Sequence, residues 1–260
     1  MRRSVAMQVL VLLAIVATIA VNAAANAVPI NGLTTGDIAN SFDVYFLPAP
    51  YVFSIWGLIY LGLVAYGIYQ ALPAQRDNAR LAAIDVPFLI ASAANMGWIF
   101  AWHYEQFPLS LLIMLVLLGA LIAIYLRLGD RREGVPTVEG WAVHVPFSIY
   151  LGWITVATVA NVTALLDHLQ WNGWGISEEI WFILVSIVVL AIVLAVLARR
   201  RDIAYGLVIP WAYVGIYARY PDVAAVALPS LVVAAAVLVA LAIVAFRGPP
   251  RAAVEPPPAG

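Results

Sequence analysis

Eight long apolar segments dominate the chain and set its fold class. A bilayer core about 30 Å thick needs roughly 20 consecutive apolar residues in helical form, because backbone polar groups inside lipid must be bonded within the segment. Segments of this kind run over about residues 4–26, 49–72, 83–104, 107–127, 141–166, 179–199, 202–219 and 224–246. The seventh is short and carries Pro210 near its middle. We therefore predict an all-α, polytopic membrane helix bundle of about eight transmembrane helices.

The composition agrees with this prediction and excludes several classes of protein. Hydrophobic residues make up 65% of the chain and charged residues only 10%, whereas soluble domains are about 45–50% apolar and about 25% charged. The net charge is −1, which excludes a nucleic-acid-binding protein built on a basic face. The chain has no cysteine, so disulfides and thiolate metal sites are excluded as well.

The arginines orient the segments, since the loops on the cytoplasmic side of a membrane protein carry the excess of positive charge. All 13 basic residues are arginines, and twelve of them lie before the first segment, in alternate loops, or after the eighth segment. Arg219 is the exception. The remaining loops carry aspartate and glutamate instead. We predict a multi-pass protein of the cell (cytoplasmic) membrane with both termini in the cytoplasm.

The N-terminal segment leaves one alternative open. Two arginines, an apolar run and a small-residue stretch at residues 25–27 could form a cleaved secretory signal, although the apolar run is longer than a typical signal core. Cleavage of residues 1–27 would leave seven spans and place the new N-terminus outside.

The chain is expected to have three parts. Residues 1–166 form a five-helix transmembrane core, in which loop 27–48 is rich in turn-forming residues and could cover the outer mouth of the bundle as a lid. Residues 167–247 hold three additional transmembrane helices with few polar side chains, which we expect to face lipid. Residues 248–260 are rich in proline and are expected to form a disordered cytoplasmic tail.

Aromatic and amide side chains on the second, third and fifth segments predict an internal pocket. Asn95 lies near the middle of the third segment, where an unpaired amide would cost several kcal/mol, so it should point inward. The other candidates recur at three- and four-residue steps and so share one face of each helix. The full set is Phe53, Trp56, Asn95, Trp98, Tyr150, Trp153, Ala157 and Asn161. Alternatively, the tryptophans form an interfacial belt and the amides only join helices.

Other chemistries find little support in the sequence. His103 and His168 both fall on the outer side and could meet as haem or metal ligands, but their spacing does not predict a metal site. Hydrolase triads, glycine-rich phosphate loops and paired-histidine motifs are absent from the sequence. No carboxylate lies at the centre of a segment, which argues against an ion pump. We predict no catalytic residue and no bound metal.

One run of residues resembles a known family. The run PAPYVFSIWGLIY, residues 48–60, resembles the second-helix signature of the TspO/MBR family, the translocator or tryptophan-rich sensory proteins. Asn95 with Trp98 is similar to the family's third-helix pattern, and residues 150–161 are similar to its fifth-helix pattern. The resemblance extends over residues 1 to about 166.

The resemblance implies a five-helix core that binds a tetrapyrrole, haem or porphyrin, as a ligand and not as a required cofactor. It also implies roles in sensing, transport or light-dependent porphyrin breakdown. Carried over by position, the pocket-lining set gains Tyr51, which stands where the family usually has tryptophan. The sterol-binding pattern expected after Asn161 is absent, so sterol binding is not predicted.

The leading functional interpretation is therefore a membrane protein that binds a hydrophobic planar ligand and acts as a sensor or carrier. The alternatives are a transporter of small hydrophobic or lipid-like solutes, a light-dependent porphyrin-degrading activity, and a structural subunit. Small residues on the fifth segment, Gly152, Thr155 and Thr158, could form the face of a homodimer.

Overall fold

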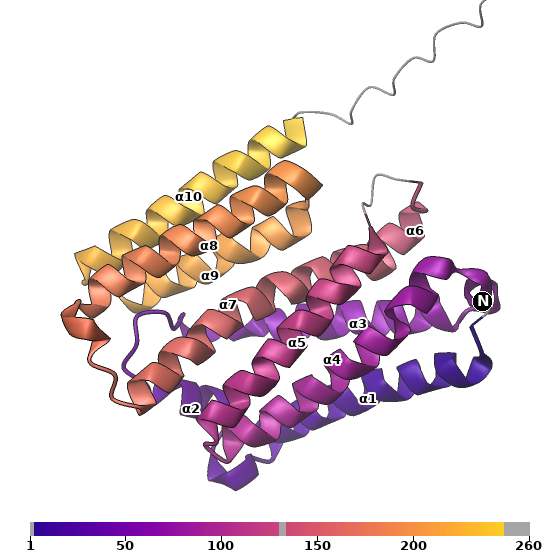
Figure 1. Ribbon diagram of the computed structural model, residues 1–260, viewed down its shortest axis with the longest axis horizontal. Helices are drawn as coiled ribbons and strands as arrows, with labels where there is room; N and C mark the ends of the chain where they lie inside the picture. Colours follow the sequence, from indigo (N-terminus) through magenta and orange to yellow (C-terminus); the bar gives the residue numbers. More distant parts are fainter. Residues whose placement is uncertain (1–2, 130–133, 247–260) are drawn as a thin grey trace, which may run out of the picture.

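The computed structural model describes residues 3–129 and 134–246, and the described residues form an all-α bundle (Figure 1). The predicted fold class is confirmed. Its long helices are α1 (Val5–Ala27), α3 (Ile55–Ala71), α4 (Ala79–His103), α5 (Phe107–Leu128), α7 (Val145–His168), α8 (Glu178–Arg200), α9 (Ile203–Arg219) and α10 (Ala224–Phe246). The predicted C-terminal tail, residues 248–260, lies outside the described residues.

Seven stretches within the described residues are long and apolar enough to cross a membrane. They are Val5–Ala27, Pro50–Ala71, Ala79–His103, Phe107–Leu128, Thr137–His168, Glu178–Arg200 and Ala224–Phe246. The eighth predicted segment forms α9, which has 17 residues and so spans only about 26 Å. The prediction of about eight transmembrane helices thus holds, with α9 as the short member.

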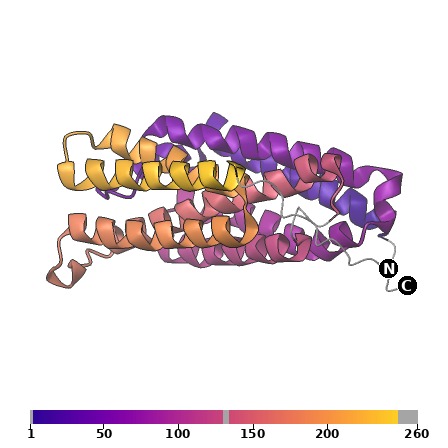
Figure 2. The same cartoon turned by 90° about the horizontal axis from the view of Figure 1, so that it is seen from above.

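The first five long helices form a ring, in which α3 packs between α1 and α7. Helix α4 packs against α1 and α5, α5 packs against α7, and α7 packs against α9. Helix α9 also contacts α8 and α10, so the last three helices form one group on the α7 side of the bundle (Figures 1 and 2).

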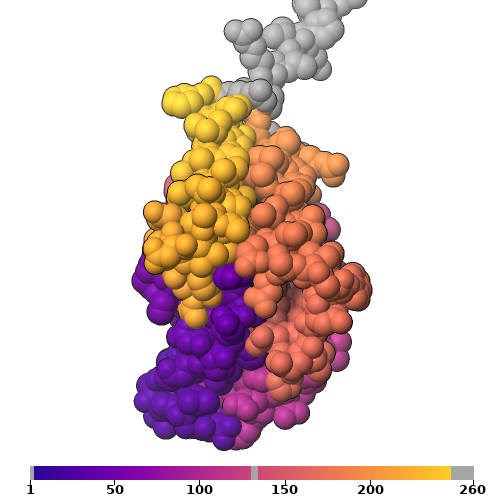
Figure 3. Space-filling model, turned by 90° about the vertical axis from the view of Figure 1, so that its left-hand side faces the viewer, coloured from indigo at the N-terminus to yellow at the C-terminus, as the bar shows by residue number. Residues whose placement is uncertain are grey.

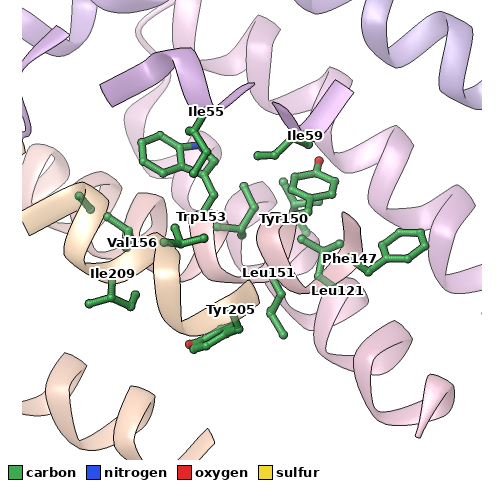
Figure 4. Close-up of a cluster of buried hydrophobic side chains, with 14 of the residues drawn as sticks. Ile55, Ile59, Leu121, Phe147, Tyr150, Leu151, Trp153, Val156, Tyr205 and Ile209 are labelled. Atoms are coloured by element: carbon green, nitrogen blue, oxygen red, sulfur yellow. The ribbon is translucent and has the colours of Figure 1, made fainter. Parts of the chain in front are cut away.

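The expectation that the last three helices face lipid is wrong for α9. Tyr205 and Ile209 of α9 are 2% and 0% exposed, and they lie beside Leu151 and Val156 of α7 (Figure 4). Hydropathy could not reveal this burial, because an apolar side chain is about equally stable against lipid and against another apolar helix.

Small residues let α9 approach the core closely. A Cβ atom added at Gly152 of α7 would lie 3.1 Å from the Tyr205 carbonyl oxygen of α9. One added at Gly215 of α9 would overlap Val52 of the 3₁₀ turn η2 (Pro50–Ser54), which precedes α3. The Tyr205 hydroxyl also donates to the Thr155 hydroxyl at 3.3 Å. These residues of α7 therefore contact α9 within the same chain, which is a use other than the homodimer face suggested by the sequence.

A widened turn interrupts the fifth span. The short helix α6 (Thr137–Glu139) continues through a π-turn, η4 (Gly140–His144), into α7, and the Val145 N–H bonds to the Gly140 carbonyl oxygen. Pro146 follows directly, and a proline ring inside a helix clashes with the carbonyl group four residues earlier. The wider π-turn gives that ring room while the helix continues.

Buried charges join the helix ends opposite to η2. The Arg3 guanidinium donates from Nε to Asp85 Oδ2 at 2.8 Å, and both side chains are nearly inaccessible. Arg80 pairs with Glu139 at the same end, and the Arg3 N–H bonds to the Arg76 carbonyl oxygen at 2.8 Å. The arginines that the sequence placed in separate loops of one side are thus neighbours in space.

Candidate functional site

An aromatic wall stands between α3, α4 and α7. Phe53 and Trp56 come from η2 and the start of α3, Trp98 from α4, and Trp153 from α7. The ring centroids of Phe53 and Trp153 are 5.8 Å apart, and those of Trp56 and Trp153 are 6.4 Å apart, both edge to face. This is a favourable geometry for aromatic pairs. The wall is therefore a packed, defined unit.

Two cavities flank this wall, and Phe53, Trp56 and Trp98 line both of them. The larger cavity, about 310 Å³, lies toward α1 and has a polar lining that includes Asn22 and Asn26. The smaller cavity, about 60 Å³, lies toward α5 and α7. Ligand pockets usually measure roughly 300–1,000 Å³, so the larger cavity alone is at the lower end of that range.

The segment between α1 and α3 covers both cavities. Its short helix α2 (Thr35–Asn40) places Thr35 beside the two of them. The Trp102 indole of α4 donates to the Thr35 carbonyl oxygen at 3.3 Å, and the Asn31 side chain donates to the His103 carbonyl oxygen at 3.1 Å. This segment, where the sequence predicted a lid, is thus bonded to the C-terminal end of α4.

A capping box starts α2. The Asp37 N–H bonds to the Thr34 hydroxyl, and the Thr34 N–H and hydroxyl donate to the Asp37 carboxylate at 2.9 and 2.7 Å. These bonds from Thr34 lower the pKa of the Asp37 carboxyl. The cap holds the first turn of α2 over the cavities.

A chain of buried polar groups backs the wall. The Asn22 side chain of α1 donates to Asn95 Oδ1 at 2.6 Å, and Asn95 Nδ2 donates to the Tyr150 hydroxyl of α7 at 2.8 Å. Asn95 is 1% exposed and lies behind the cavity linings, where it joins three helices. The sequence analysis missed Asn22, although an amide inside an apolar segment is itself a signal that the side chain points inward.

Two indole N–H groups of the wall are buried without an acceptor among the described residues, those of Trp98 and Trp153. A buried unsatisfied donor costs about 1–3 kcal/mol. Both tryptophans line the smaller cavity.

The remaining predicted residues divide into two groups. Ala157 and Asn161 line the smaller cavity, and the Asn161 side chain donates to the Ser110 hydroxyl at 3.3 Å. Tyr51 lies elsewhere, 46% exposed and edge to face with Trp211 of α9 at 5.4 Å. Two steps of about 100–120° separate Tyr51 from Phe53 along the turn of residues 50–54, so the two side chains point in different directions and only Phe53 lines the cavities.

His103 and His168, which the sequence placed on the outer side, contact different groups. Within the described residues, no group of three or more metal-ligating side chains comes together. His103 Nδ1 lies 2.7 Å from the Ile99 carbonyl oxygen, and its Nε2 lies 3.4 Å from the Thr35 hydroxyl. His168 packs on the edge of Phe107. Each histidine ring is therefore held by contacts within the fold, His103 by hydrogen bonds and His168 by the Phe107 ring.

Comparison with known proteins identifies the family. Neither the curated proteins nor the solved structures give a match. A family model described as "TSPO-like protein" matches residues 8–246, a range that takes in α8, α9 and α10 as well as the aromatic wall. The chain belongs to the TSPO-like protein family of multi-pass membrane proteins.

Proposed function

We propose that this protein binds a planar hydrophobic molecule, a tetrapyrrole such as haem or protoporphyrin, at the aromatic wall and acts as its sensor or carrier. The observation that carries the proposal is the pair of unpaired indole N–H groups, Trp98 and Trp153, at a cavity walled by aromatic rings. Aromatic faces stack on a flat ring system, and the two indole N–H groups would donate to its π-face. The resemblance of residues 48–60 to the TspO signature favours the tetrapyrrole among flat ligands.

Binding of this guest requires the wall to move. The cavities of about 310 and 60 Å³ are separated by Phe53, Trp56 and Trp98, which line both. A macrocycle of four pyrroles fits only when these rings turn aside and the two spaces join. The polar side of the larger cavity, with Asn26, Thr34 and Asn40, suits the carboxylates that porphyrins carry at one edge.

We also propose that this site opens to the outer side of the cell membrane and that both termini are cytoplasmic. The support is the clustering of Arg3, Arg76 and Arg80 at the opposite end of the bundle, together with the tendency of arginine-rich ends to stay on the cytoplasmic side.

The test is a titration of the full chain in lipid nanodiscs with protoporphyrin IX, followed by tryptophan quenching. The Trp98→Phe variant keeps an aromatic ring and removes the N–H, and it should bind about five- to tenfold more weakly, the equivalent of one hydrogen bond of about 1–1.5 kcal/mol. The matched control is Trp141→Phe, because Trp141 is 64% exposed at the other end of the bundle. Absence of saturable binding, or equal weakening in both variants, would contradict the proposal.

A further inference from the structure

A third cavity lies away from the aromatic wall, between the core and the last three helices. It measures about 570 Å³, and it is an open cleft lined by the outer ends of α7 and α8, the loop between them, and residues 43–46. It is larger than the two cavities beside the wall, and its size is within the ordinary range for small-molecule sites, roughly 300–1,000 Å³. Figure 3 faces this end of the molecule.

The lining of this cavity changes from apolar to acidic along the helix axes. Val159 of α7 and Val185 of α8 line its deep part. Asp167 and Glu178 lie about two turns further toward the outer ends of the same helices, about 12 Å from Val159 and about 10.5 Å from Val185 at 1.5 Å per residue. Asp43 joins them from the loop before η2. The cavity is therefore amphipathic, with carboxylates at its mouth.

These carboxylates have no cation beside them in the part of the chain that the structure describes. The cavity lining includes neither arginine nor histidine, and no ion pair or hydrogen bond of the Asp43, Asp167 or Glu178 side chain is present among the described residues. Arg219, the arginine that the sequence placed on this side, donates to the Asn40 side chain and the Tyr220 hydroxyl instead. The negative charge at the mouth is thus available to a cation from outside the chain.

Aromatic rings complete the site. Trp171 and Trp181 line the cavity with ring centroids 5.3 Å apart. The Trp181 indole is fixed by its hydrogen bond to the Gly173 carbonyl oxygen at 2.9 Å. Tyr45 also lines the cavity and donates to the Glu179 carboxylate at 3.2 Å. Faces of tryptophan and tyrosine attract cations, so the rings and the carboxylates favour the same kind of charge.

We infer that this cavity is a binding site for a cationic amphiphile, a molecule with an ammonium-type or other onium head and an aromatic or alkyl body. The head lies at the mouth among Asp43, Asp167 and Glu178, and the body lies between α7 and α8. An interfacial belt explains tryptophans at this depth, but it does not explain a cavity of about 570 Å³ with three carboxylates in its lining. Anionic headgroups and porphyrin carboxylates are repelled by the same charges, which separates this site from the aromatic wall.

The test uses two probes of nearly equal shape and opposite charge, tetraphenylphosphonium and tetraphenylborate. Each is added to the full chain in nanodiscs of uncharged phospholipid, and binding is measured by equilibrium dialysis against empty nanodiscs. The phosphonium should bind saturably and the borate should not. Asp167→Asn should weaken phosphonium binding about fivefold, the factor produced in water by one unit charge at about 4 Å. Glu178→Gln, at the first residue of α8, provides the same measurement if the first variant does not fold.

Two controls locate the site. Glu105→Gln removes one carboxylate from an exposed turn on the same side that does not line the cavity, so it should leave binding unchanged. Trp98→Phe, at the aromatic wall, should also leave it unchanged. Equal binding of the two probes, or phosphonium binding that is insensitive to both carboxylate variants, would overturn the inference. Competition by protoporphyrin together with a loss in Trp98→Phe would overturn it too, because the cation would then occupy the wall.

Discussion

The contact between α9 and η2 leads to a prediction in which two chemically identical substitutions have opposite effects. Gly215→Ala adds a Cβ atom that would overlap Val52 and lie 3.1 Å from the Pro48 side chain. Overpacking of this kind costs about 1–3 kcal/mol, and the better helix propensity of alanine returns up to about 1 kcal/mol. We therefore expect a net loss of about 1–2 kcal/mol in the free energy of unfolding.

Gly119→Ala is the matched control. Gly119 lies inside α5, and a Cβ atom there meets no neighbouring atom within 4 Å. Alanine has a better helix propensity than glycine, and its Cβ meets no neighbour here. The substitution should therefore raise the free energy of unfolding by about 0.5–1 kcal/mol. Reversible unfolding in mixed detergent micelles, followed by tryptophan fluorescence, measures both variants.

A rescue variant tests the cause. Val52→Ala removes the methyl groups that the new Cβ of Gly215→Ala would meet. The double variant should therefore be more stable than the sum of the single effects predicts, by about 1 kcal/mol. If Gly215→Ala stabilises the protein as Gly119→Ala does, or if the two single effects simply add, then α9 does not approach η2 as described.

Three further predictions concern polar groups. In a double-mutant cycle, Asn95→Leu and Tyr150→Phe should show a coupling of about 0.6–1.7 kcal/mol in unfolding experiments, because their side chains share a buried hydrogen bond; a coupling of zero would contradict the bond. Since the folded-state pKa of Asp37 is lowered, the stabilisation of α2 is present above the unfolded value of about 3.9 and disappears as the pH falls through the folded value. The protection factors of the amides of residues 34–40 in hydrogen exchange should accordingly fall in acid, and Asp37→Asn should lose this pH dependence. Arg3→Gln leaves the buried Asp85 carboxylate without its hydrogen-bond partner and should cost about 3–5 kcal/mol in unfolding free energy. Arg80→Gln should cost clearly less, because the Glu139 carboxylate keeps hydrogen bonds from Tyr69 and Asn78; equal losses would refute this reasoning.

The membrane architecture could be predicted from the sequence because the bilayer imposes a length and an apolar composition on every span. The same reasoning explains what was missed. Hydropathy measures only the preference for apolar surroundings, so it could not distinguish the buried α9 from the more exposed α8 and α10. The close approach at Gly152 and Gly215 depends on which helices are neighbours, and that information lies outside any single segment.

The candidate site was predictable where the helix is regular. Trp98 lies one turn after Asn95 on α4, and Trp153 one turn after Tyr150 on α7; the two indoles meet at the smaller cavity, while Asn95 and Tyr150 pair behind the wall. Tyr51 was placed at the pocket only by its position in the family resemblance, and it lines neither cavity. Whether the residues at this site bind the proposed ligand stays a prediction.

Pairings between distant segments could not be predicted in the same way. Asp85 pairs with Arg3, which is 82 positions away in the chain, and Asn95 pairs with Asn22 of α1. Each segment indicated that its polar residue needs a partner, but the sequence alone did not identify that partner.

The π-turn at Gly140–His144 has a consequence for how sequences of this kind can vary. Its Val145-to-Gly140 bond spans one residue more than a regular helical bond, and each residue of a helix corresponds to about 100° of rotation about the axis. Deleting one residue here would restore ordinary winding and rotate one half of the span relative to the other. If Glu139 kept its partner Arg80, then Tyr150 and Trp153 would turn away from α3 and α4. We therefore expect relatives that keep both the Arg80–Glu139 ion pair and the aromatic wall to have the same number of residues between the positions of Glu139 and Trp153.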